Sequence, residues 1–108
     1  MIEHRKEKGY TIATVSGKLM GGPETAEFYN FINSLQLNGT VNLILDLGNV
    51  RWINGAGIRA LINSDASLKQ YNRAIKFVNL SPKVKDILTI TGVSSVLDIY
   101  DSVEDAKK

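Results

Sequence analysis

The pattern of apolar and polar residues changes its period within one stretch of the chain, residues 41–63. Apolar side chains predominate from Val41 to Leu47, with Asp46 as an interruption near the end. Such a run is typical of a strand that is buried on both faces of a partly parallel sheet. A second short apolar segment, Val50 to Ile53, follows. The first half of the stretch therefore predicts a central, buried strand.

The second half of the stretch has the spacing of a helix. Ile58, Leu61 and Ile62 recur at the i, i+3, i+4 positions that form one helical face. Asn54 precedes them, and asparagine is a preferred N-cap because its side chain accepts a bond from a free backbone N–H. Two glycines flank residue 56, which predicts a tight strand-to-helix turn. This turn would lie at the carboxyl end of the sheet, where loops are free to carry function.

The remaining pattern predicts a chain of alternating strands and helices. Gly9 marks a turn between two N-terminal strands, residues 17–23 form a loop, and Ser81 with Pro82 begins a later helix. The predicted strands are residues 2–6, 10–16, 41–47 with 50–53, 74–78 and 96–100; the predicted helices are 23 to about 37, 57 to about 71, 81 to about 91, and one or two turns after residue 101 or 102. The fold class is α/β, with a mixed sheet of four to five strands, about four helices and the order β-β-α-β-α-β-α-β-α.

Length and composition favour one small domain over residues 1–108 and limit its chemistry. The chain has 108 residues, no cysteine and a net charge of +2. Thiolate metal sites and cysteine nucleophiles are therefore excluded, and scattered basic residues argue against nucleic-acid binding. The longest apolar run is too short to span a bilayer, so a cytoplasmic protein is the expectation.

The candidate catalytic residues are few. His4 is the only histidine and has no partners at metal-ligand spacing, so no metal site is expected. Asp46 is interpreted as a structural acid that accepts bonds from nearby turns. Residues 54–57 lack the full spacing of a phosphate loop, so a nucleotide cofactor is not expected. Trp52, the single tryptophan, is expected to pack beneath the turn as a core or rim anchor, with partner contact as the less favoured alternative.

Residues 45–57 read L-D-L-x-x-V-x-x-hydrophobic-N-x-x-G. This arrangement resembles the signature of the STAS domain, named for sulphate transporters and anti-sigma-factor antagonists. Gly17-Lys18-Leu19 before a helix, Asn79-Leu80-Ser81 followed by Val84, and the acidic segment 100–106 extend the resemblance over most of the chain. A STAS-like fold is therefore expected.

The resemblance also implies a function and one departure from it. In bacterial antagonists the turn usually reads D-S-S-G or N-S-S-G, and its second serine is phosphorylated by an anti-sigma-factor kinase. Ala56 stands at that position here and has no hydroxyl. The expectation is a non-enzymatic antagonist that binds a kinase or anti-sigma-factor partner without this switch; the alternative is an accessory or scaffold subunit of a transporter or signalling complex. The expected partner-binding residues are Met20, Gly21, Gly22, Asn54, Gly55, Ala56, Gly57, Ile58 and Arg59.

Overall fold

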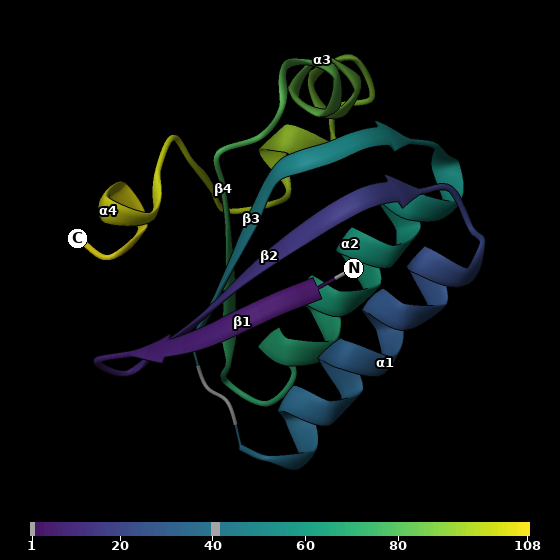
Figure 1. Cartoon of the computed structure of the whole chain (residues 1–108). Helices are drawn as coiled ribbons and strands as arrows, with labels where there is room; N and C mark the ends of the chain where they lie inside the picture. Colours follow the sequence, from purple (N-terminus) through teal and green to yellow (C-terminus); the bar gives the residue numbers. More distant parts are fainter. Residues whose placement is uncertain (1, 40–41) are drawn as a thin grey trace.

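The computed structural model of the protein describes residues 2–39 and 42–108 (Figure 1). Its strands form one mixed sheet of five strands. The strands lie side by side in chain order, β1-β2-β3-β4-β5. β1 pairs with β2 in the antiparallel sense, and the other neighbours are parallel. The strands are β1 Ile2–Glu7, β2 Tyr10–Leu19, β3 Asn42–Ile53, β4 Ala74–Val78 and β5 Ile99–Tyr100.

Four α-helices connect or follow these strands: α1 Pro23–Leu37, α2 Gly55–Lys69, α3 Pro82–Ile90 and α4 Val103–Ala106. A short 3₁₀ turn, Val93–Ser95, lies between α3 and β5. The predicted α/β class, the mixed sheet and the element order are therefore confirmed.

The two faces of the sheet are covered very differently. α1 and α2 lie on one face, and α4 lies on the other (Figure 1). The first face belongs to a large core that includes Phe28, Ile32, Leu45, Leu61 and Phe77. The second face carries a small cluster of buried residues, namely Ile12, Ile44, Val78 and Ala106. Asp46, on the second face, accepts a bond from Gly48 N at 2.9 Å, which is the structural role predicted for it.

β3 is the longest strand and extends past its neighbour. β4 pairs only with Asn42–Asp46, so the far half of β3 has no strand on that side. α3 packs there, with Val84 and Leu88 in the large core. Ser81 occupies the N-cap position, but its hydroxyl donates to Val50 O at 2.8 Å instead of capping its own helix. That bond ties the start of α3 to the strand.

Several predicted boundaries were wrong in an informative way. β2 continues through Gly17, at φ +107°, to Leu19, where a loop was expected. β3 is one continuous strand, because bulges absorb the polar residues between its two apolar segments. The predicted start at residue 41 lies outside the described residues. α2 begins at Gly55 and ends at Lys69, two residues early at both ends.

The last strand is shorter than predicted. Residues 96–98 do not belong to it, because the amides of Val96 and Leu97 both donate to Val93 O in a local turn. Val96 is also 57% exposed, so its apolar side chain gave a misleading strand signal.

Candidate functional site

Asn54 joins the two segments that sequence analysis proposed as a binding surface. Its Oδ1 accepts from the backbone amides of Ala56 and Gly57, at 3.0 and 3.2 Å, and so caps α2 as predicted. Its Nδ2 donates to Met20 O at 3.1 Å, and its own backbone amide donates to Leu19 O at 3.3 Å. One side chain therefore fixes the start of α2 against the loop that follows β2.

Gly57 makes this close approach possible. A Cβ atom built on Gly57 would lie 2.0 Å from Leu19 O, a distance that no real side chain tolerates. Gly57 is buried, so the space that its missing side chain leaves is filled by the protein's own backbone.

The loop after β2 is hydrogen-bonded to the first turn of α1. Gly21, at φ +91°, donates its amide proton to Thr25 Oγ1 at 2.9 Å. A Cβ on Gly21 would lie 3.0 Å from the Cβ of Ala56, so the loop and the turn are in contact. Glu24 Oε2 accepts from the backbone amide of Lys18 at 3.1 Å. The two predicted segments form one preorganised surface.

The nine predicted residues differ in exposure. Met20, Gly21, Gly22, Asn54, Gly55 and Arg59 are exposed. Ala56 and Ile58 are half-buried, and Ile58 packs against the large core. The structure thus brings all nine together, while Gly57 and Ile58 serve mainly to build the surface.

Thr25, Ser64 and Ser67 do not replace the hydroxyl that is missing at Ala56. Thr25 and Ser64 are buried, and Ser67 is half-buried with its Oγ accepting from Gln36 Nε2. A kinase that docks at Ala56 would therefore meet none of these three hydroxyls in the position that a serine at the tip of α2 would have.

Sequence reasoning missed the exposure of Trp52. Trp52 is 47% exposed, so it does not lie in the core; of the expected core or rim positions, only the rim is compatible with this exposure. The strand pairing gives the reason: Gly17 pairs with Val50 and Lys18 with Trp52, which leaves Arg51 as an extra residue in β3. Such a bulge re-aims side chains, and periodicity alone does not reveal it.

Lys83, which lies in α3, contacts the ring of Trp52 in β3. Its ammonium group lies 4.1 Å from the centroid of a Trp52 ring, a cation–π contact between the first turn of α3 and the end of β3. No signal in the sequence pairs two residues that are 31 positions apart. Trp52 and Lys83 lie next to the predicted surface, since Trp52 immediately precedes Ile53 and Asn54.

Other chemistry finds little support in the described part of the chain. Residues 2–39 and 42–108 contain no group of three His, Asp or Glu side chains that could hold a metal ion. His4 lies in β1, with its ring 5.3 Å from that of Phe31. Over the same residues, no helix is both long enough and apolar enough to cross a lipid bilayer.

The comparisons with known proteins agree with this fold. The sequence model of the STAS domain matches residues 1–106, and the chain therefore belongs to the STAS domain family. BtrV of Bordetella bronchiseptica, named as a proposed anti-sigma factor antagonist, is 29% identical over 68 residues. That match covers 63% of this chain and 59% of BtrV.

Two solved structures show how the fold is used elsewhere. TM1081 of Thermotoga maritima, titled a proposed anti-sigma factor antagonist, superposes with a TM-score of 0.82 at 17% identity, over 98% of this chain and 91% of its own. The murine anion transporter Slc26a9 superposes with a TM-score of 0.73 at 23% identity, over 94% of this chain but only 18% of the transporter. The fold is therefore that of anti-sigma factor antagonists, and it also occurs as a small part of a transporter.

Proposed function

We propose that this protein is a non-enzymatic antagonist of the anti-sigma-factor class that acts in the bacterial cytoplasm. On this proposal it binds a kinase or anti-sigma-factor partner through residues 20–22 and 54–59. The observation that carries the proposal is the bonded contact between these two segments around Asn54. A surface held this rigidly loses little conformational entropy when a partner binds.

Ala56 sets the regulatory state of this surface. In the resembling antagonists a phosphate at this position adds close to two negative charges and releases the partner. Ala56 carries no acceptor, so the protein stays in the state that corresponds to the unphosphorylated antagonist. It would bind its partner constitutively.

Titration against the anti-sigma factors encoded in the same genome tests the proposal directly. Calorimetry with the folded protein should find one that binds with a simple stoichiometry. Failure of every such protein to bind would overturn the proposed function.

The lost switch has its own test. Ala56→Ser places a hydroxyl at the exposed start of α2 and adds one oxygen to a half-buried side chain. A cognate kinase with ATP should add one phosphate to this variant and none to wild type, as measured by mass spectrometry. Ala66→Ser is the matched control, because Ala66 is exposed on the same helix but lies more than two turns from its tip. Stoichiometric phosphorylation of wild type on Thr25, Ser64 or Ser67 would show instead that the acceptor has moved.

The alternative is an accessory or scaffold subunit of a transporter or signalling complex. The missing acceptor and the likeness to part of Slc26a9 favour it. Gene neighbourhood separates the two: a permease operon supports the accessory role, whereas a sigma factor beside a serine kinase supports the antagonist.

A further inference from the structure

Two large apolar side chains are exposed at the ends of neighbouring strands. Met20, just after β2, is 44% exposed, and Trp52, near the end of β3, is 47% exposed. Leu19 and Ile53, which pair with each other across the same two strands, are buried in the large core. The core therefore does not need Trp52. Tryptophan is enriched among residues that dominate binding and methionine adapts readily to a partner, so these two exposed side chains are typical of a protein-binding surface.

The contact with Lys83 restrains the Trp52 side chain in its exposed position. The ammonium group of Lys83 lies over the indole, and Lys83 belongs to a helix whose first turn is bonded to β3 through Ser81. The tryptophan is thus restrained on one side by a cation. A partner that covers the ring must also meet that positive charge.

Basic residues predominate in the segments around these two apolar residues. Residues 17–22, 49–59 and 79–83 contain four basic side chains and no acidic one: Lys18, Arg51, Arg59 and Lys83 are the four. Glu24, which follows the loop, lines the same hollow as Lys18 and Arg51 and accepts from the Lys18 backbone amide, so its carboxylate offsets one of these four positive charges. The whole chain carries only +2, so the basic charge at this end of the sheet is a local concentration.

The start of α2 adds to this field. The Asn54 side chain already accepts from two amides of the first turn of α2, but that turn has no acidic residue, so no negative charge offsets the partial positive charge of the helix N-terminus. The guanidinium of Arg59 lies over that turn, with Nη1 3.6 Å from where a Cβ of Gly55 would be. Guanidinium groups and helix N-termini both favour carboxylates.

We propose that this surface binds an acidic protein segment that also carries apolar side chains. Apolar groups of the segment cover Met20 and Trp52, while its carboxylates pair with Arg51, Arg59 and Lys83. The assignment of that segment to a kinase or anti-sigma factor rests on the proposed function; the chemistry of the segment rests on the surface alone. A nucleic acid fits less well, because two large apolar side chains are exposed on this surface.

The same charges would explain why a phosphate releases the partner from relatives that carry a serine at this position. A phosphate at position 56 would sit beside Arg59 and the helix N-terminus, where it competes with the partner's carboxylates. The same charges that recruit the partner would then be neutralised by the modification.

Substitutions test the surface once a binding anti-sigma factor has been identified. Trp52→Ala and Lys83→Glu should each weaken binding by about tenfold or more, as central aromatic and charged contacts usually do. Lys85→Glu changes the same charge on the same helix away from Trp52, and Tyr71→Ala removes an exposed aromatic residue from a different turn; both should stay within about twofold. Binding that is indifferent to Trp52→Ala and Lys83→Glu would overturn this inference and leave the proposed function standing.

A second measurement needs no partner. A short peptide of alternating glutamate and leucine, added to the ¹⁵N-labelled protein, should shift the Trp52 indole signal and the amides of Gly55 and Ala56. The matched glutamine–leucine peptide should not. Because Trp52 is the single tryptophan, its fluorescence reports the same event. Absence of these shifts, or stronger shifts with a short duplex DNA, would overturn the inference whether or not any anti-sigma factor binds.

Discussion

The two faces of the sheet are stabilised by different physics. Of the residues that the structure describes, nineteen are buried on one face in the large core under α1, α2 and α3. On the other face, four of them are buried in a small cluster under α4. α4 itself has four residues, far fewer than a helix needs for stability on its own. Apolar packing therefore accounts for the first face, whereas the small cluster on the second face contributes only part of what positions α4.

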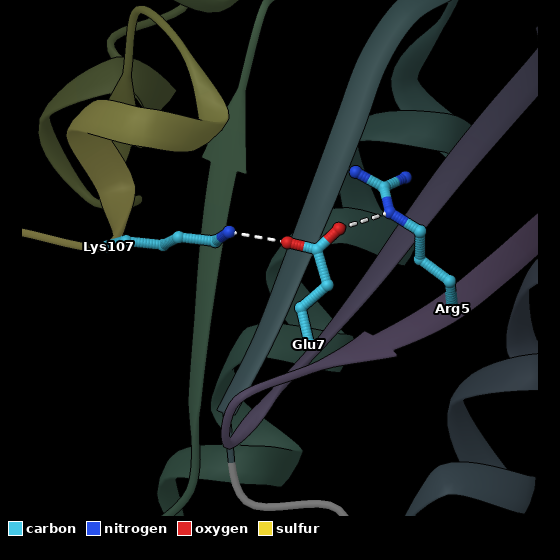
Figure 2. A network of polar contacts seen from close by, with 3 residues as sticks. All are labelled: Arg5, Glu7 and Lys107. Atoms are coloured by element: carbon cyan, nitrogen blue, oxygen red, sulfur yellow. Dashed lines mark hydrogen bonds and ion pairs between the residues drawn. The ribbon is translucent and has the colours of Figure 1, made fainter.

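Polar and cation–π contacts hold α4 in place. Lys107, just after α4, donates to Glu7 Oε1 at 2.6 Å, and Arg5 Nε donates to Glu7 Oε2 at 2.6 Å (Figure 2). Lys76 Nζ donates to Ala106 O at 2.7 Å and lies 5.8 and 5.4 Å from the ring centroids of Tyr10 and Tyr100. The helices on one face of the sheet are therefore held mainly by apolar packing, whereas α4 on the other face is positioned largely by a few hydrogen bonds and charged contacts.

The largest effect is expected in the large core. Phe28 is completely buried on α1, so Phe28→Ala should lower the free energy of unfolding by about 3–5 kcal/mol through lost burial and a residual cavity. Denaturant unfolding measures the change. Leu37→Ala is the control on the same helix, because Leu37 is 90% exposed, and it should change stability by no more than about 0.5 kcal/mol. Similar effects for both variants would contradict the account of this face.

The large core is also the part of the fold that sequence patterns predict best. Phe28, Ile32 and Leu35 follow the helical period and are all buried. The apolar run of β3 likewise predicted a central strand, and β3 has neighbours on both sides. Such features follow from local periodicity because each element must bury one continuous set of side chains.

The candidate site was predicted only in part, since its local and long-range features differ. Asn54 as the helix cap follows from local chemistry. Trp52 and Lys83 do not, because a bulge exposes the first and a separate helix brings in the second. The Glu7–Lys107 pair joins residues 100 positions apart and has no sequence signal at all.

The next effect concerns the junction between the large core and the candidate site. Gly57→Ala would force a Cβ against Leu19 O, and overpacking of this kind costs about 1–3 kcal/mol. Gly55→Ala is the matched control two residues earlier in the same helix. Its Cβ would meet only Arg59 Nη1 at 3.6 Å, so it should be neutral or stabilising by up to about 1 kcal/mol. A lower melting temperature for Gly55→Ala than for Gly57→Ala would show that the close contact with Leu19 O does not restrict the residue at position 57.

Removal of α4 tests the weaker face. Deletion of residues 102–108 exposes the cluster of Ile12, Ile44 and Val78 but removes only one completely buried side chain, Ala106. We expect a loss of about 1–2 kcal/mol, well below that of Phe28→Ala. Binding of a hydrophobic dye should rise as the cluster becomes accessible. A loss as large as that of Phe28→Ala would mean that the two faces do not differ as described.

The smallest effect is the contribution of the ion pair itself, and pH reveals it. The hydrogen bond from Lys107, followed by that from Arg5, lowers the pKa of Glu7 from 4.5 to about 2. Because the folded pKa is below the unfolded one, this stabilisation is present above about pH 4.5 and is lost as the pH falls toward 2. Wild type should therefore lose stability over that range more steeply than Glu7→Gln, which cannot titrate at this position.

The control for this comparison is Asp86→Asn, which removes an exposed carboxylate on α3. Urea unfolding at a series of pH values should give this variant the wild-type slope between pH 4.5 and 2. Glu7 and Lys107 are both accessible to solvent, so concentrated salt should reduce the difference between wild type and Glu7→Gln. Equal slopes for wild type and Glu7→Gln at low salt would show that α4 is held by Lys76 and the small apolar cluster, without a contribution from Glu7.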